Sequence, residues 1–284
     1  MSLPKGYKRL EYIQSSGAQY IDSGFVPNQD TRVYAECVLA TASSTQALFG
    51  CRVSSSSRQY QFVTQGGAYR TDYNTTITNL STANFGTSRF TVDKNKNVTY
   101  LNGTSVATHT YALFTCPGNM YIFATNNNGA VYAQATATLY CMRVYDNGTL
   151  VRDFVPCQNA SGAVGLWDAV NEVFYGNAGT GTFTAGPVIQ APGKPSGLAH
   201  ALSVRLVWSA VSGAISYNIY RDGAFVGSSN LPTFVDVSAA ENQTYVYGVS
   251  AVGQGGEGEP ATLTVYTKAG YFEYKPLIES ANFQ

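Results

Sequence analysis

Apolar and polar residues alternate with a period of two over residues 31–39, where Val33, Ala35, Cys37 and Leu39 fall on one face. Successive side chains of a β-strand point to opposite faces, so this alternation predicts a strand with one buried face. Similar short runs, rich in β-branched and aromatic residues, recur at 47–53, 59–64, 90–92, 98–101, 121–124 and 137–144. Helical signals are nearly absent, and the chain is therefore expected to be all-β.

Asn-Gly and Asp-Gly pairs stand between several of these runs. They occur at Asn102-Gly103, Asn147-Gly148 and Asp222-Gly223. A type I′ turn needs positive φ at both central residues, which Asn, Asp and Gly accept most readily. Each pair therefore predicts a tight reversal between two strands. The segment Arg221-Asp222-Gly223 is interpreted as such a turn and not as an Arg-Gly-Asp motif, because its order differs.

Many short strands with turns between them predict a two-sheet antiparallel sandwich over residues 5–188. Within it, residues 99–103 (TYLNG) and 139–145 (LYCMRVY) resemble a hairpin and a late strand of laminin-G and concanavalin A-like jelly rolls. The resemblance implies that fold for the first domain. Residues 140–183 are expected to close the sandwich at its edge, with Cys141, Val144 and Phe154 in the core.

The two ends of this region carry a second resemblance. Residues 10–25 (LEYIQSSGAQYIDSGF) and 148–186, which include LVRDFVP, VGLWD and GTGTF, resemble the opening and closing segments of certain phage and prophage domains. Those domains occur in tail and minor structural proteins of phages of gut bacteria. The resemblance implies a virion component or a surface-exposed structural module, and it implies no reaction chemistry.

Composition changes at residues 187–197 (PVIQAPGKPSG), where three prolines predict a linker. Beyond the linker, Trp208 and the run 245–252 (YVYGVSAV) resemble the core tryptophan and a long strand of fibronectin type III domains, with Tyr245 as the tyrosine corner. The predicted organisation is a concanavalin A/laminin-G-like β-sandwich jelly roll over 5–188, a smaller fibronectin type III β-sandwich over 189–268, and a C-terminal tail over 269–284.

Charged residues make up 12% of the 284 residues, and the formal net charge is zero. Soluble domains usually carry about 25% charged residues, so the surface here is expected to consist of uncharged polar residues and tyrosine. Nothing concentrates phosphates, and nucleic acid is not an expected partner. No apolar run reaches the roughly 18 residues of a membrane helix, and the N-terminus does not resemble a signal peptide. We therefore expect no membrane insertion.

The sequence lacks the residue spacings that known reaction centres require. The five cysteines lack zinc-site spacing and are expected to be buried, reduced thiols. Asp168 and Glu172 are the nearest approach to the paired carboxylates of a glycosidase, and they fall in a predicted turn. We therefore expect a non-enzymatic protein without a cofactor. Calcium at the rim of the sandwich, with Asp146, Asp168 and Asn171 available, is left open.

Carbohydrate binding is the specific role that this surface favours, because sugars are held by aromatic faces together with amides and carboxylates. Residues 69–74 are interpreted as a loop that is dense in such groups. The expected ligand-binding residues are Tyr69, Arg70, Asp72, Tyr73, Asn74 and Trp167.

The predicted function is that of a structural or adhesion protein associated with a phage or prophage tail. Its expected partners are cell-surface glycans or other structural proteins, and its expected location is the virion or the extracellular cell surface. Two alternatives are a secreted bacterial surface protein and a carbohydrate-binding accessory module of a polysaccharide-degrading enzyme. A glycoside hydrolase is a third class, and the oligomeric state is left open.

Overall fold

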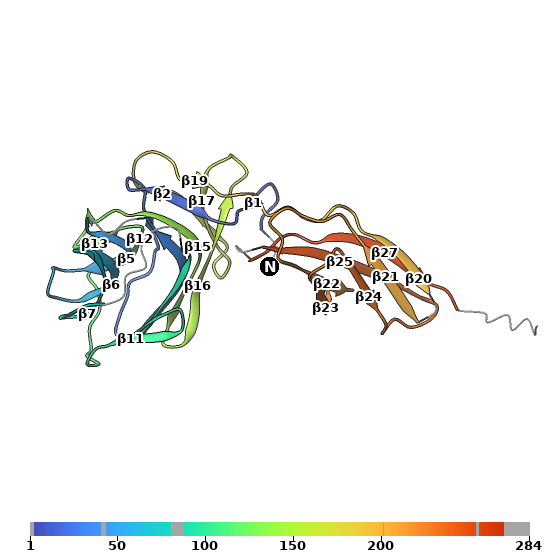
Figure 1. The fold of residues 1–284 in the computed structure, drawn as a ribbon. Coiled ribbons are helices and arrows are strands. Elements are labelled where there is room, and N and C mark those ends of the chain that lie inside the picture. The colour runs from blue at the N-terminus through green and yellow to red at the C-terminus, as the bar shows by residue number, and fades with distance from the viewer. Residues whose placement is uncertain (1–2, 41–43, 81–87, 201, 254–255, 270–284) are drawn as a thin grey trace, which may run out of the picture. The chain divides into compact units, whose positions relative to one another are not determined.

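The computed structural model describes residues 3–40, 44–80, 88–200, 202–253 and 256–269 (Figure 1). These residues form strands, turns and loops without any α-helix, which confirms the all-β prediction. Accordingly, the described part of the chain has no helix long and apolar enough to span a membrane. One compact unit comprises the residues up to Ile189 together with Gly253 and Gly256, and the other comprises Gln190–Val252 and the residues from Glu257 on. The predicted tail lies outside the described residues beyond Ala269.

The larger sheet of the first unit has the strand order β11-β10-β9-β4-β15-β16-β17-β18. Three short strands attach to its flank: β1 pairs with β16, β2 with β15, and β19 with β2. The strands of this sheet have the bounds β1 Lys8–Arg9, β2 Ile13–Ser16, β4 Thr31–Leu39, β9 Phe90–Asn95, β10 Val98–Leu101, β11 Thr104–Thr108, β15 Thr136–Asp146, β16 Thr149–Gln158, β17 Val164–Asp168, β18 Val173–Tyr175 and β19 Thr184–Ala185.

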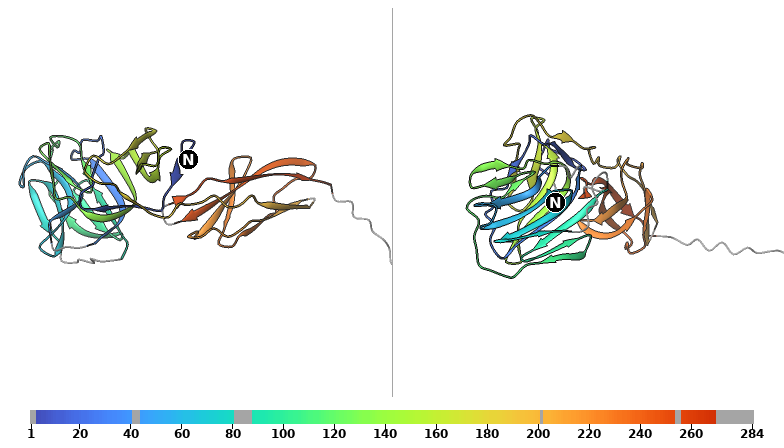
Figure 2. Two further views of the ribbon diagram at one scale, coloured as in Figure 1. Left: turned by 90° about the horizontal axis from the view of Figure 1, so that it is seen from above. Right: turned by 60° about the vertical axis from the view of Figure 1, so that its left-hand side comes forward.

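The smaller sheet has the order β14-β13-β5-β6-β7-β8, and β12 joins β3 to β5 at its side. The two sheets face each other as layers, which Figure 2 shows from two further directions. The bounds are β3 Ile21–Asp22, β5 Gln46–Arg52, β6 Gln59–Gln65, β7 Ala68–Asn74, β8 Thr76–Asn79, β12 Tyr121–Ile122, β13 Thr125–Asn127 and β14 Ala130–Tyr132.

Apolar side chains from both sheets form one core. The ring of Tyr69 on β7 lies 5.1 Å from that of Phe90 on β9, and 5.4 Å from that of Phe62 on β6. The predicted alternation on β4 is confirmed, since Val33, Ala35, Cys37 and Leu39 are all buried in this core. Burial of these side chains removes a large apolar area from water and stabilises the sandwich.

The stretch predicted as a closing edge begins instead at the centre of the larger sheet. Strand β15 pairs with β4 on one side and with β16 on the other. Val144 and Phe154 are fully buried as expected, but Cys141 is only half-buried. A register shift between Leu139 and Cys141 interrupts the alternation. Such a bulge adds one residue to the strand, so Met142 takes the core position instead.

The turn predictions are confirmed by the backbone. Both central residues have positive φ in Asn102-Gly103, Asn147-Gly148 and Asp222-Gly223. The first two pairs connect β10 to β11 and β15 to β16, and the third connects β22 to β23. The folded chain therefore keeps the turn conformations that the local sequence specifies.

All five cysteines are free thiols, and four of them are buried.

The second unit is a smaller pair of sheets, β20-β21-β24 and β23-β22-β25-β26, with β27 paired to β25. Trp208 is buried beside Tyr217 in its core, at a ring distance of 5.2 Å. The Tyr245 hydroxyl accepts a hydrogen bond from the main-chain N–H of Ala240 at 3.0 Å. The bounds are β20 Ser196–His200, β21 Ser203–Val207, β22 Ser216–Arg221, β23 Ala224–Ser229, β24 Thr233–Asp236, β25 Gln243–Gly253, β26 Gly256–Glu257 and β27 Ala261–Thr267.

A lysine lies inside the core of the first unit. Lys94 is fully buried, and its Nζ donates a hydrogen bond to Thr71 Oγ1 at 2.9 Å and lies 4.8 Å from the centre of the Tyr60 ring. Burial lowers the pKa of Lys94 to about 7, against an opposing influence of the Asp72 charge. Burial and the Lys94 charge also lower the pKa of His109, to about 4.

Candidate functional site

The stretch predicted as a binding loop is strand β7, inside the smaller sheet. Tyr69 and Tyr73 are 2% and 1% exposed and belong to the core, so neither ring can stack on a ligand at the surface. The loop interpretation was wrong because the segment has a strand's period of two, with aromatic residues facing inward and polar residues outward. The polar residues Arg70, Asp72 and Asn74 gave the segment a composition that is typical of loops.

Arg70 and Asp72 lie on the opposite face of β7, and both are nearly fully buried. Arg70 Nη2 is 2.6 Å from Asp72 Oδ2, and the same oxygen accepts a hydrogen bond from Gln61 Nε2 on β6. Thr125 Oγ1 on β13 donates to Gln61 Oε1 at 2.9 Å. Asn74, half-buried with φ 53°, begins the turn from β7 to β8. Three of the six predicted residues therefore share this face or its margin.

Trp167 does not provide a surface platform either. Its side chain is 9% exposed and packs in a small second cluster with Val155, Cys157 and Ala169. The ring centre of Tyr7 lies 5.4 Å from that of Trp167. The ring is covered because β17 lies between β16 and β18 and the N-terminal segment packs on this face, and ligand binding by Trp167 stays a prediction.

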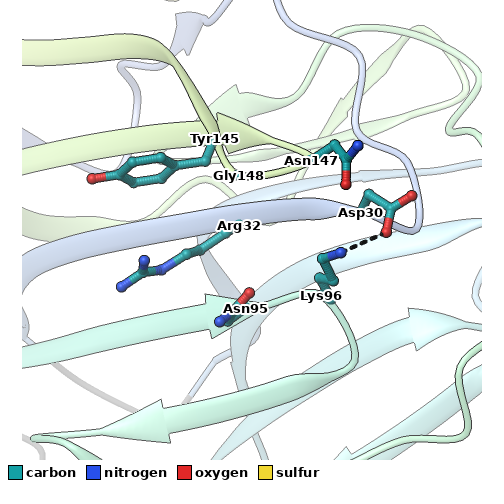
Figure 3. Close-up of a pocket in the computed structure, with 7 residues that line it drawn as sticks. All are labelled: Asp30, Arg32, Asn95, Lys96, Tyr145, Asn147 and Gly148. Carbon is teal, nitrogen blue, oxygen red and sulfur yellow. Dashed lines mark ion pairs between the residues drawn. The ribbon is translucent and has the colours of Figure 1, made fainter.

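A hollow of about 240 Å³ opens at the rim of the larger sheet (Figure 3). It forms where β9, β4 and β15 lie side by side, and Arg32 pairs with Asn95 on one neighbour and Tyr145 on the other. We call it the rim pocket, and it is lined by Asp30, Arg32, Asn95, Lys96, Tyr145, Asn147 and Gly148.

Every charged side chain of the rim pocket has a partner of opposite charge. Arg32 donates through Nε and Nη2 to the two carboxylate oxygens of Asp93, each at 2.8 Å, and lies 5.1 Å over the Tyr145 ring. Lys96 Nζ is 2.9 Å from Asp30 Oδ1 (Figure 3). The hydrogen bond from Lys96 lowers the pKa of Asp30, and the same bond raises the pKa of Lys96.

Aromatic rings complete the surroundings of the rim pocket. The Tyr111 hydroxyl donates to Asp30 Oδ1 at 3.2 Å, and this side chain is 48% exposed. Asn95 and Asn147 add amides, which both donate and accept hydrogen bonds. The sequence did not reveal this site because three distant segments supply it, and each was interpreted only as a strand end or a turn. The available signal was the strand register that aligns Asn95, Arg32 and Tyr145.

The residues considered for calcium hydrogen-bond within the protein. Asp168 is fully buried and accepts hydrogen bonds from the main-chain N–H groups of Asp153 and Val170 and from Asn171 Nδ2. Asp146 accepts a hydrogen bond from Asn28 Nδ2 at 3.0 Å. Among the residues that the structure describes, no three His, Cys, Asp or Glu side chains gather as a metal site would require. Calcium binding stays a prediction.

Comparison with known proteins gives limited matches, and no family model matches the chain. A poly(3-hydroxybutyrate) depolymerase from Ralstonia pickettii is 38% identical over 100 residues, which is 33% of this chain and 19% of the depolymerase. The matched segment thus spans about a fifth of that enzyme's length.

Three solved structures are similar over parts of the chain. An Fn3-like protein from Clostridium thermocellum is 28% identical, with 29% of this chain and 100% of that chain covered and a TM-score of 0.24. A β-1,2-glucanase from Parabacteroides distasonis is 12% identical, with coverages of 88% and 29% and a TM-score of 0.27. The tripod of the bacteriophage Tuc2009 baseplate is 10% identical, with coverages of 94% and 82% and a TM-score of 0.19.

Proposed function

We propose that this protein is a non-enzymatic structural or adhesion protein that binds cell-surface carbohydrate through the rim pocket. The first unit is assigned to the concanavalin A/laminin-G-like jelly rolls and the second to the fibronectin type III domains. The proposed location is a phage or prophage tail, with the extracellular cell surface as the alternative. The resemblance of residues 10–25 and 148–186 to the opening and closing segments of tail-protein domains motivates this location.

One observation carries the ligand class: the rim pocket places the Tyr145 ring beside two amides and the Asp30 carboxylate, which is paired with Lys96, around a single hollow. A sugar ring has apolar faces that pack on aromatic rings, and its hydroxyl groups need donors and acceptors in several directions. The ion pairs leave the pocket without a strong net charge. This arrangement favours a neutral, hydroxyl-rich ligand over a phosphate or a metal ion.

The test is a glycan array, followed by calorimetry on any glycan that binds. Tyr145→Ala and Asn95→Ala should each weaken the binding at least about tenfold, because each removes a contact group from the pocket. Tyr266→Ala is the matched control, since Tyr266 is a 56% exposed tyrosine of the second unit. An array without hits, combined with tight binding to a purified protein partner, would refute the carbohydrate assignment. The non-enzymatic assignment fails if incubation with a bound glycan releases new reducing ends.

A second candidate is an accessory module of a polymer-degrading enzyme. The 38% identity to part of a poly(3-hydroxybutyrate) depolymerase favours it. Binding to films of that polyester, with the rim variants unaffected and the glycan array empty, would support this candidate against the first.

A further inference from the structure

The smaller sheet carries a polar face on the side turned away from the core. Tyr60 and Phe62 on β6 point into the core, so Gln59 and Gln61 between and beside them point outward. Register pairs Gln61 with Gly50 on one side and with Asp72 on the other. We call this the outer polar face, and it comprises Arg52, Gln59, Gln61, Arg70, Asp72 and Thr125.

Gly50 lies at the centre of the outer polar face and leaves room for its neighbours. A Cβ at this position would lie 2.6 Å from Thr125 Oγ1 and 2.7 Å from Gln61 Cβ. Because the glycine has no side chain, Thr125 and Gln61 meet above it in their 2.9 Å hydrogen bond. The side chains of this face are thereby held in fixed positions, as a preorganised binding site requires.

Among the residues that the structure describes, three buried polar atoms on the outer polar face have no hydrogen-bond partner: Gln59 Nε2, Arg70 Nε and Asp72 Oδ1. Gln59 and Asp72 are fully buried, and Arg70 is 6% exposed. Buried polar groups nearly always have a partner, so three unpaired atoms on one face require an explanation. The set consists of two donors and one acceptor. A hydroxyl group fits it, since one hydroxyl both donates and accepts.

An exposed ring borders the same face. Tyr132 on β14 pairs with Thr125, is 42% exposed, and lies 4.5 Å from the Arg52 guanidinium above its ring. The Arg52 Nε in turn donates to Asn127 Oδ1 at 3.0 Å. This cation–π contact fixes the ring at the accessible margin of the face. A sugar residue that packs on Tyr132 would place the hydroxyl groups of neighbouring sugar residues over the outward side chains of β6 and β7.

We propose that the outer polar face is a second ligand-binding site, which takes the hydroxyl groups of an oligosaccharide. In this site Asp72 Oδ1 accepts from a ligand hydroxyl, and Gln59 Nε2 and Arg70 Nε donate to ligand oxygens. The ligand class rests on the proposed function, whereas the location rests on the unpaired atoms. The site is separate from the rim pocket, which belongs to the other sheet.

Gln59→Met is the variant that tests this site. It removes an unpaired buried donor and keeps the side-chain length, so the free protein should melt about 2–4 °C higher. The same change should weaken the binding of an array glycan at least about tenfold. A residue with a purely structural role would not combine greater stability with weaker binding. Tyr132→Ala, at the exposed margin, should weaken the binding without lowering the melting temperature by more than a few degrees.

The remaining outcomes separate this site from the rim pocket. Gln243→Met, an exposed substitution in the second unit, is the matched control and should change neither property. If Tyr145→Ala loses binding while Gln59→Met and Tyr132→Ala bind as the wild type does, the second site is refuted and the proposed function stands. If Gln59→Met melts higher and binds the glycan normally, the unpaired atoms make no hydrogen bond to the ligand, and the second site is likewise refuted. If only Gln59→Met and Tyr132→Ala lose binding, while Tyr145→Ala binds normally, the second site is supported and ligand binding at the rim pocket is refuted.

Discussion

The rim pocket and the outer polar face contain the same kinds of side chain in very different surroundings. Each has an arginine–aspartate ion pair with amides nearby. The side chains of Arg32 and Asp93 at the rim are 38% and 23% exposed, whereas those of Arg70 and Asp72 are 8% and 0% exposed. Exposed pairs contribute about 0–1 kcal/mol, while loss of one partner from a buried pair costs about 3–5 kcal/mol. Burial therefore decides what each site contributes to folding.

The difference bears on how each site can change. Substitutions at the rim alter the ligand contacts with little cost in folding free energy. Substitutions on the outer polar face act on folding and binding together, because its polar groups are buried and several are unpaired. The rim is consequently the place where specificity can vary freely, and the face is the place where variation is constrained.

Asp72→Ala should have the largest effect on this comparison. It leaves the Arg70 guanidinium buried without its carboxylate, and it removes the acceptor of the Gln61 amide. We expect a loss of about 3–5 kcal/mol in the free energy of unfolding, measured by urea denaturation. A loss below about 1 kcal/mol would mean that the two ion pairs do not differ as described.

Lys94→Met tests the cost of a buried charge within the core. The pKa of Lys94 is about 7 in the folded protein against an ordinary 10.5, so between these values the unfolded chain binds more protons. The wild type should therefore gain stability as the pH rises through this window. We expect Lys94→Met to be more stable by roughly 2–4 kcal/mol at pH 6.5 and to lose much of that advantage at pH 9. The difference between the two proteins cancels the titrating groups that the Lys94 charge does not influence, and a constant difference would contradict the assignment.

Asp93→Ala is the rim counterpart of the first variant. Water can solvate Arg32 when its carboxylate partner is removed, because the guanidinium side chain is 38% exposed. The expected loss in the free energy of unfolding is below about 1 kcal/mol, and added salt should reduce it further. A loss as large as that of Asp72→Ala would show that exposure does not separate the two sites.

Lys96→Ala should have the smallest effect and concerns proton binding. The hydrogen bond from Lys96 is the main cause of the lowered pKa of Asp30, so its removal should return that pKa toward the ordinary 3.8. Carbon-detected NMR of the Asp30 carboxyl across pH 2–6 measures the change. Since the folded-state pKa is depressed, the stabilising contribution is present above the ordinary value and is lost as the pH falls. An unchanged titration would contradict the Lys96 contact.

Local pattern predicted much of the fold but not the surroundings of its polar groups. The alternation at 31–39 and the Asn-Gly turns are determined by neighbouring residues, and the structure confirms both. The environment of Asp72 is not local, since β6 and β8 on either side of β7 and the side chains of the same face bury it. The register shift before Cys141 is likewise a property of the paired strands. The rim pocket depended on the register between β9, β4 and β15, which no single segment specifies.

The turn at Asn147-Gly148 also makes the rim pocket subject to slow chemical change. Asparagine followed by glycine is the pair most prone to deamidation, and Asn147 is exposed at the tip of its hairpin. Loss of its amide turns a neutral lining group into a carboxylate beside the paired charges of Asp30 and Lys96. Aged protein would therefore present a more acidic rim than freshly made protein. The age of a preparation then becomes a variable in any measurement of ligand affinity at this pocket.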